Sequence, residues 1–371
     1  NLQQFLKIAR EKNLDLKIDQ AKVDTAKAKA NGINLPPPML SLNQMKMQDT
    51  EEKANGFEVS QTIPFPTKLL KDSSARNYAA KSQEEMRQAR ESEILAEAKL
   101  LYFSLWSAQE RLSLLEMKKK ILEDHIKLSR STARSDNFAG VHILKTESDL
   151  DLLNNEITDS EQLSKEAQFK IAVFLNEDQS HFQITTEEPA LSAIPSLRST
   201  EESHQFKTFQ FNLESFKSRE TEAKSSWLPD FTLTYKEMGA SSMYPKYNEI
   251  MVGVSLPFIF FWEPYGQSKA ASAERMQAQF ELEKQKKSID ADKIILLSKI
   301  ENLKKQILTL KEKTIPRAEK RTKLVHNLAP RDMETLQDHR DTMEALPDLK
   351  MKALDLRLQY EQAISSLEKY L

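Results

Sequence analysis

The sequence predicts a mainly α-helical protein with a small β part, arranged as an internal two-fold repeat. Only 6 of the 371 residues are glycine, whereas average usage is about 7% and loop-rich folds need more. The stretch from Leu69 to Arg134 contains neither glycine nor proline. Two pairs of short segments alternate apolar and polar residues, and both pairs are flanked by prolines at one constant spacing.

The amino-acid composition disfavours nucleic acid as a partner and excludes chemistry that depends on cysteine. Charged residues make up 30% of the chain, with 54 Lys and Arg interspersed among 56 Asp and Glu, for a net charge of -2. No single-sign field therefore favours nucleic acid as a partner. The chain has no cysteine, which excludes disulfides, thiolate metal clusters and a cysteine nucleophile. It opens at Asn1 rather than Met, which indicates a processed or trimmed sequence.

The first half of the chain has four predicted elements. They are a helix over 1–31, a β-hairpin over 38–64, a long helix over about 69–134 and a return helix over about 142–175. Asn31-Gly32 ends the first helix, and Asn55-Gly56 lies in the turn region between two alternating runs. Gly140 lies near the turn between the long helix and the return helix.

The long helix carries a heptad pattern, which is typical of coiled coils. Its apolar positions are Ile94, Leu101, Ala108, Leu115 and Leu122 on one seam, and Ala98, Leu105, Leu112 and Ile126 on the other. A second long helix, predicted over about 266–328, repeats the pattern with Ile289, Leu296, Leu303 and Leu310. Each long helix is expected to form a coiled-coil hairpin with the helix that follows it.

The second half repeats the first at a constant spacing of 193 residues. The pairs at this spacing include Pro36 with Pro229, Pro64 with Pro257, Leu40 with Leu233 and Val59 with Val252. Such self-similarity indicates an internal duplication. Gly140 and Ala329 are 189 residues apart, which predicts that the second repeat has lost about one helical turn.

The predicted organisation is a first structural repeat over 1–176, a linker or equatorial segment over 177–199 and a second repeat over 200–371, with its β-hairpin at 230–258. In each repeat the two shorter helices together match the length of the long one. They are therefore expected to stack end to end beside it, which makes each repeat a long rod.

The predicted strands each have one apolar face, and no other apolar segment at that end of the rod covers it. Four strands are too few to close a membrane barrel, because the smallest such barrels have eight. Three copies supply twelve strands, with apolar side chains facing outer-membrane lipid, polar side chains facing water and no open edge. The sequence therefore predicts a homotrimer with a 12-stranded transmembrane β-barrel.

Aromatic residues cluster at the strand ends nearest the helices. They fit a girdle at the membrane interface, and they equally fit the cap of an ordinary helix–sheet core. The candidate interface aromatics are Phe65, Trp227, Phe258, Phe261 and Trp262.

These features together resemble the TolC-type outer-membrane efflux proteins, the exit ducts for heavy metals and drugs. The resemblance spans essentially the whole chain in the two-copy order of that family. The resemblance rests on four features of the sequence. They are the opening Asn1-Leu2-Gln3-Gln4-Phe5-Leu6, Leu35-Pro36, Trp227-Leu228-Pro229, and the paired segments 59–65 and 252–258. It implies a trimeric barrel in the bacterial outer membrane, continued by a long α-helical barrel in the periplasm.

The resemblance also implies functional residues at the far ends of the helices. The hairpin tips would dock on a periplasmic adaptor (a membrane fusion protein) of an inner-membrane pump. These tips include Asn137, Phe138, Gly140, Val141, Leu328, Pro330 and Arg331. Asp338 matches a family position that closes the tunnel, with Asp341 and Glu334 nearby. The second tip has Ala329-Pro330 where the family usually has glycine, and the three acidic residues also fit an ordinary solvated helix face.

Catalysis is not expected, and the predicted function needs no cofactor or resident metal. The six histidines form no HExxH motif, and the chain has no glycine-rich phosphate loop. The methionines of the predicted hairpins fit soft-metal ligands along an exit path, or side chains that fill gaps or face lipid. They are Met39, Met45, Met47, Met238, Met243 and Met251.

Two alternative functions remain at this stage. An exit duct for type I protein secretion shares the fold, and the sequence does not separate it from an efflux duct. A structural coiled-coil protein or a periplasmic adaptor explains the heptads without a membrane, but not the two alternating hairpins. The transported substrate and the pump partner are not indicated by the sequence.

Overall fold

The structure is a computed structural model that describes residues 1–46, 53–132, 139–178, 183–240, 245–260, 262–326 and 333–370. Contacts divide the chain into two units. The first unit contains Asn1–Ile18, Ala89–Ser199 and Ile289–Leu371, and the second contains Asp19–Gln88 and Thr200–Ser288. Within the described ranges, no helix has both the length and the apolar composition needed to cross a membrane.

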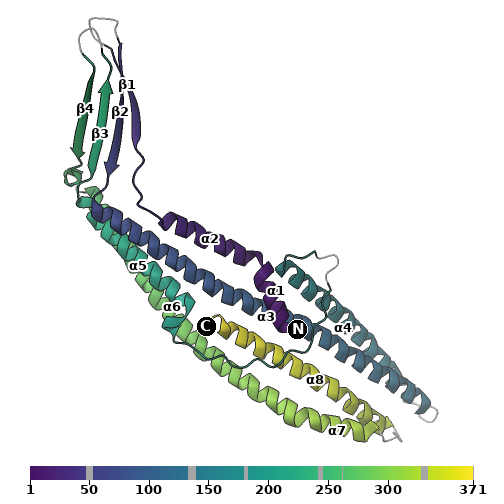
Figure 1. The fold of residues 1–371 in the computed structure, drawn as a ribbon. Helices are drawn as coiled ribbons and strands as arrows, with labels where there is room; N and C mark the ends of the chain where they lie inside the picture. The colour runs from purple at the N-terminus through teal and green to yellow at the C-terminus, as the bar shows by residue number, and fades with distance from the viewer. Residues whose placement is uncertain are drawn as a thin grey trace. The chain divides into compact units, whose positions relative to one another are not determined.

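The mainly helical fold with a small β part is confirmed (Figure 1). The helices are α1 (Leu2–Lys12), α2 (Leu14–Ala30), α3 (Pro66–Thr132), α4 (Ala139–Phe174), α5 (His204–Lys224), α6 (Trp262–Thr309), α7 (Ile315–His326) and α8 (Met333–Glu368). The strands are β1 (Met39–Lys46), β2 (Lys53–Ile63), β3 (Phe231–Met238) and β4 (Tyr247–Val254). Short 3-10 turns lie at Thr200–Glu202, Ser225–Trp227 and Pro257–Phe260.

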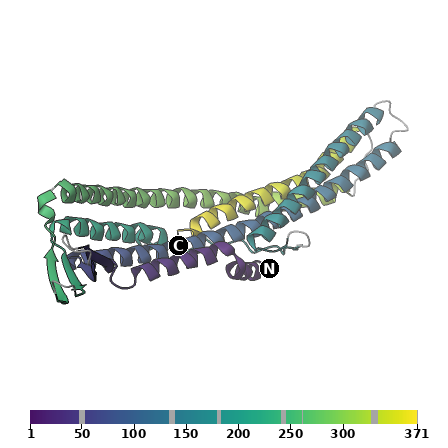
Figure 2. The same ribbon diagram turned by 90° about the horizontal axis from the view of Figure 1, so that it is seen from above.

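The predicted heptad seam of α3 packs in the core of the first unit. Ile94 and Leu105 are 0% exposed. Leu115 and Leu122 pack against Leu153 of α4, and Figure 2 shows α4 lying along the C-terminal part of α3. This pair is therefore the first coiled-coil hairpin.

The second repeat builds its hairpin in the same way, but its long helix is not uniform. Ile300 and Leu303 of α6 pack against Ile364 of α8. A π-helical segment at Leu310–Thr314 separates α6 from α7. Pro316 accounts for it, because proline has no N–H to donate to the carbonyl four residues earlier and its ring crowds that carbonyl. A π turn accommodates this loss within an otherwise continuous helix.

The single helix predicted over 1–31 is instead two helices that meet at Asn13. The Asn13 side chain is 4% exposed. Its Oδ1 accepts hydrogen bonds from the N–H groups of Asp15 (2.9 Å) and Leu16 (3.3 Å), which caps the start of α2. Its Nδ2 donates to the carbonyl of Phe174 in α4 (3.2 Å). A side chain that caps one helix and contacts another fixes the break.

The predicted loss of a helical turn in the second repeat is wrong. The last residues of α4 and α8, Phe174 and Glu368, are 194 residues apart, one residue more than the spacing of the hairpins. At this spacing the counterpart of Gly140 in the second repeat is Glu334 in α8 rather than Ala329.

The four strands form one antiparallel sheet in the order β1-β2-β3-β4 (Figure 1). Leu40 pairs with Val59 in the first hairpin, and Leu233 pairs with Val252 in the second. Adding the 193-residue spacing to a residue pair of the first hairpin therefore gives the equivalent residue pair of the second hairpin. This match is what an internal repeat predicts.

The linker has neither helix nor strand over residues 183–199. Side chains of α3 and α8 hold its backbone instead. Gln109 Nε2 donates to the carbonyl of residue 184 (3.1 Å), the Tyr102 hydroxyl to that of residue 187 (3.1 Å), and the Tyr360 hydroxyl to that of residue 192 (2.9 Å). These side chains supply partners that a neighbouring strand would otherwise give.

Candidate functional site

One face of the sheet is apolar and exposed. Leu40, Val59, Tyr235 and Ile250 form one row across all four strands, and Leu40 is 65% and Ile250 72% exposed. The same face continues with Leu42, Phe57, Gln61, Ile63, Phe231, Leu233, Val252 and Val254. A contiguous apolar surface of this kind marks a contact with lipid or with another protein.

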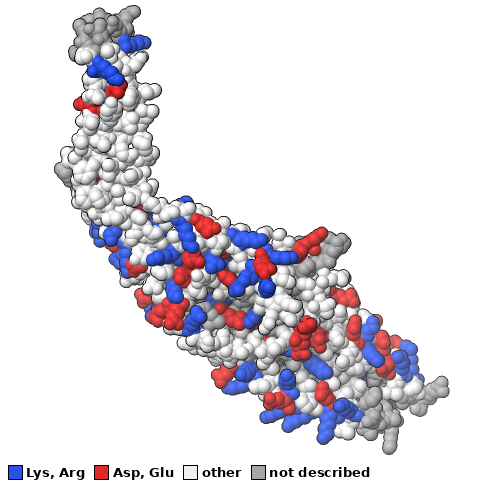
Figure 3. Space-filling view, viewed as in Figure 1, with Lys and Arg blue, Asp and Glu red and all other residues white. Residues whose placement is uncertain are grey.

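The opposite face of the sheet is polar. Near the helices it carries Ser60, Thr62, Thr232 and Thr234. In Figure 3 the strands are largely free of charged side chains, and those present gather toward the hairpin-loop end. The sheet therefore separates an apolar surface from a hydroxyl-rich one.

An ionic junction in the second unit fixes the sheet to the start of α3. Asp230 Oδ1 accepts hydrogen bonds from the Phe65 N–H (2.9 Å) and from Lys68 Nζ (2.8 Å). Lys68 Nζ also donates to the carbonyl of Leu228 (2.9 Å), and the Asp230 N–H donates to Ser255 Oγ (2.7 Å). The sequence reasoning missed this junction, because Lys68 and Asp230 are 162 residues apart.

The structure describes the side chains of three of the five predicted interface aromatics. Trp227 is 38% and Trp262 60% exposed, and Phe65 is half-buried beside the junction. Phe261 and the side chain of Phe258 lie outside the described residues. The two tryptophans leave substantial apolar surface at the strand ends nearest the helices.

The predicted constriction residues lie on α8. Asp338 and Asp341 are exposed, and Gln337 Nε2 donates to Asp341 Oδ1 (2.8 Å). At about 100° per residue, Asp338 projects roughly 160° away from the buried Leu336 and Arg340, and Asp341 roughly 140° and 100° away from them. Glu334 is within the helix, but its side chain lies outside the described residues.

The predicted docking tips are mostly outside the described residues. This applies to Asn137, Phe138, Leu328, Pro330 and Arg331. Gly140 and Val141 lie in the first turn of α4, and Val141 is 64% exposed.

A buried polar cluster, which sequence reasoning missed, joins α8 to α4. Arg340 is 8% exposed. Its Nη2 lies 2.6 Å from Asp149 Oδ2, its Nε lies 2.6 Å from Glu344 Oε1, and its Nη1 donates to Thr146 Oγ1 (3.4 Å). Two carboxylates compensate the buried guanidinium, so the cluster is a charge-balanced link between the two helices.

His125 of α3 lies beside this cluster and is 5% exposed. Burial lowers its pKa to about 4, and the charges of Arg340 and His339 act in the same direction. Asp341 raises this pKa and His142 lowers it. His125 is therefore neutral near pH 7.

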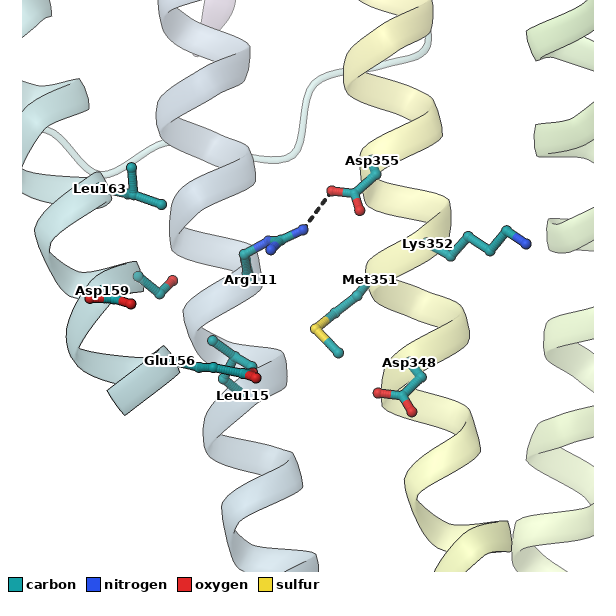
Figure 4. Close-up of a pocket in the computed structure, with 10 residues that line it drawn as sticks. Arg111, Leu115, Glu156, Asp159, Leu163, Asp348, Met351, Lys352 and Asp355 are labelled. Carbon is teal, nitrogen blue, oxygen red and sulfur yellow. Dashed lines mark hydrogen bonds and ion pairs between the residues drawn. The ribbon is translucent and has the colours of Figure 1, made fainter. Parts of the chain in front are cut away.

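A cavity of about 520 Å³ opens between α3, α4 and α8 (Figure 4). Leu115, Leu163 and Met351 supply its apolar lining. Arg111 points toward Asp355 across it, with Nη2 2.7 Å from Oδ1. No cluster of three His, Cys, Asp or Glu suited to a metal ion occurs among the residues that the structure describes.

No protein-family model and no curated protein matches the sequence. The structure, however, is similar to solved outer-membrane channels. The outer-membrane channel OprN is 12% identical with a TM-score of 0.82, covering 100% of this chain and 89% of that chain. The open-state channel MtrE of Neisseria gonorrhoeae is 15% identical with a TM-score of 0.82, covering 100% and 88%.

The outer-membrane channel CmeC of Campylobacter jejuni is 13% identical with a TM-score of 0.81, covering 100% of this chain and 85% of that chain. The chain therefore has the fold of the TolC-type outer-membrane channels, as the resemblance of its sequence predicted. At these identities the likeness establishes the fold.

Proposed function

We propose that three copies of the chain form a passive exit duct in the bacterial outer membrane. The helical part would lie in the periplasm and receive substrate from a periplasmic adaptor and an inner-membrane efflux pump. The observation that carries this proposal is the sheet itself. It has four strands, one exposed apolar face and one polar face, with β1 and β4 at its two edges.

The sheet is suited to closure by oligomerisation. If β4 of each copy pairs with β1 of the next, both edges disappear and three copies form twelve strands. The apolar face runs from Ile63 to Phe57 along β2, roughly 20 Å of strand at about 3.3 Å per residue. At the strand tilt of about 35–45° in membrane barrels, this length covers roughly 15 Å of an outward apolar band about 25 Å tall.

The helices of the first unit also offer apolar surface for packing between subunits. One side of α4 carries a stripe of exposed apolar residues, each more than half exposed. They are Val141 (64%), Leu144 (65%), Leu152 (63%), Leu163 (54%) and Val173 (61%). A stripe that its own chain leaves uncovered supports a helical barrel of several copies.

The duplication supports a division of the chain into repeats 1–176 and 200–371 joined by the linker 177–199, since α4 and α8 end 194 residues apart. In the proposed duct, the ends of α3, α4, α7 and α8 dock on the adaptor. Asp338 and Asp341 face the constriction, where three copies of each would meet at the symmetry axis.

Assembly and conductance in detergent test the proposal. The purified chain is expected to require detergent, to migrate as a trimer in cross-linking and size-exclusion experiments, and to give discrete channels in planar bilayers. A chain that stays monomeric and soluble without detergent would instead support a coiled-coil scaffold or adaptor. Conductance that rises in Asp338→Ala would place this residue at the closure, and unchanged conductance would remove it.

An exit duct for type I protein secretion has the same architecture. Reconstitution with the pump components of the source cell separates the two uses. Export of small molecules supports efflux, and export of a polypeptide supports secretion.

A further inference from the structure

We propose that one row of the polar sheet face forms an ion-selectivity ring that favours cations. The row consists of Glu58, Lys236 and Glu249 and is called the charged row below. The proposal rests on the trimeric barrel proposed above, and it adds a property of the barrel interior, its preference among small ions.

Strand register brings the three residues together. Glu58 of β2 pairs with Lys236 of β3, and Lys236 pairs with Glu249 of β4. Directly paired residues of antiparallel strands project on the same face, and neighbouring strands lie about 4.8 Å apart. The charged row thus crosses three adjacent strands at one level, on the face opposite Leu40 and Val59.

The charged row holds all the Asp, Glu, Lys, Arg and His side chains described on the polar face of the strands. The other members of that face with described side chains are Met39, Ser41, Asn43, Ala54, Gly56, Ser60, Thr62, Thr232, Thr234, Met238, Tyr247, Met251 and Gly253. None of these is an Asp, Glu, Lys, Arg or His side chain. Fixed charge on this face is therefore confined to a single level.

The charges of this row are not cancelled within the chain. In the described part of the chain, no ion pair within 4.0 Å joins Lys236 to either glutamate. Glu58 accepts a hydrogen bond from the Asn43 amide (3.4 Å), and Glu249 is exposed. On the apolar face, by contrast, Glu237 forms an ion pair with Lys246 at 2.5 Å.

The balance of the charged row is negative. Each chain contributes two carboxylates and one ammonium group, so three chains give a net charge of about -3 at one level of the barrel. Rings of charged side chains set ion selectivity in pores. Their field extends about 10 Å at 0.1 M salt and about 3 Å at 1 M, so the preference is expected at low salt and fades at high salt.

Reversal potentials in a KCl gradient across planar bilayers test the inference. The double variant Glu58→Gln/Glu249→Gln is expected to lower the ratio of K⁺ to Cl⁻ permeability by roughly twofold or more at 0.1 M salt. Lys236→Gln is expected to raise it, because it leaves both carboxylates in place. The matched control is Glu237→Gln, which removes a carboxylate from the neighbouring row on the other face and is expected to leave the ratio unchanged.

The outcomes separate this inference from the proposed duct. Wild-type protein that forms no channels overturns the duct itself. Channels whose permeability ratio is the same in wild type, the double variant and Lys236→Gln overturn the charged row while leaving the duct in place. Trimer recovery in detergent is measured for each variant, and Lys236→Gln decides the question if the double variant does not assemble.

Discussion

The two repeats agree in their β-hairpins and differ in their helices. A single spacing of 193 residues superimposes the registers of the two hairpins, residue for residue. In the helices, α3 is continuous over 67 residues, whereas α6 and α7 are separated by the π segment before Pro316. Duplicated strands have thus kept their alignment more strictly than duplicated helices.

Periodicity explains the contrast. Side chains alternate along a strand with period 2, so a shift of one residue moves every apolar side chain to the opposite face. Along a helix, one extra residue rotates the apolar stripe by about 100°, and a π turn can absorb the change locally. A sheet with two different faces therefore tolerates an odd insertion only where a β-bulge confines it, while a helix absorbs one more easily.

The largest expected effect follows from this rule. Insertion of one alanine between Leu233 and Thr234 reverses the faces of the rest of β3 and is expected to abolish trimer formation and channel activity. Insertion of two alanines at the same place restores the alternation and is the matched control. Cross-linking and bilayer conductance measure both. Equal loss in the two variants would contradict the role of alternation.

The second expected effect concerns equivalent helix positions that have diverged. Thr146 of α4 and Arg340 of α8 are 194 residues apart, the spacing of the two helices, and their side chains meet at 3.4 Å. Arg340→Met leaves Asp149 without its cation and Glu344 with only Lys118, at 3.9 Å, and is expected to cost about 3–5 kcal/mol. Thr146→Val is expected to cost under about 1.5 kcal/mol. Thermal unfolding in detergent compares the two, and similar losses would argue against the charge-balanced link.

The third expected effect compares one glycine from each hairpin. A Cβ at Gly56 would lie 2.3 Å from Met238 Sδ and 2.4 Å from the carbonyl oxygen of Glu237. Gly56→Ala is therefore expected to destabilise the β2–β3 pairing by on the order of 3 kcal/mol. A Cβ at Gly253 meets Thr232 atoms only at 3.7 Å or more, so Gly253→Ala is the control with little effect. Unfolding temperatures that fall equally would refute the close approach at Gly56.

The fourth expected effect is a pH dependence in α3. The pKa of His125 is lowered to about 4 in the folded chain, against about 6.5 in an unfolded one. The unfolded state binds the proton first, so this contribution to stability is present above pH 6.5 and is lost as pH falls toward 4. At pH 5 the loss is about 2 kcal/mol. His125→Leu should flatten the difference in melting temperature between pH 7 and pH 5, and an unaltered slope would contradict it.

The smallest expected effect is at the π segment. Pro316→Ala restores an N–H donor, which allows the segment to return to α-helical bonding. The change in unfolding free energy is expected to be under about 1 kcal/mol, since π and α bonding satisfy most of the same groups. Circular dichroism melts check this, and a large loss of helix would show that the proline is required.

The fold was predictable where the pattern is local and periodic. The heptads of α3 and the alternation around Val59 and Val252 needed only neighbouring residues, so these helices and strands followed from the sequence. The turn of the first hairpin did not, because Asn55 and Gly56, expected in the turn region, lie inside β2 and pair with β1. The break at Asn13 did not, because the helical stripe continues across it and the capping contact with Phe174 is distant in sequence. The π segment was missed because one extra residue hardly alters a glycine-free helical pattern.

The candidate site was less predictable than the fold. Lys68 with Asp230 and Arg340 with Asp149 are joined across 162 and 191 residues, and no spacing in the sequence distinguishes them from surface charges. The charged row, in contrast, follows from register alone once the pairing of β2, β3 and β4 is known. The functional proposal for Asp338 and Asp341 stays a prediction, and their exposure on α8 is consistent with it.

The backbone of the linker is held by side chains of helices α3 and α8, so the sequence of these helices matters for the conformation of the linker. Its carbonyls are bound by Gln109, Tyr102 and Tyr360, and a backbone carbonyl is the same in almost every amino acid. Substitutions at most exposed positions of residues 183–199 should therefore be tolerated. Changes to Ile184, which packs against the core of the first unit, to Thr186, whose hydroxyl donates to Gln109 Oε1 (2.6 Å), and to the three helical side chains should not. In a library of variants, the constraint on this segment would appear in helices α3 and α8, at positions up to about 170 residues from the segment they hold.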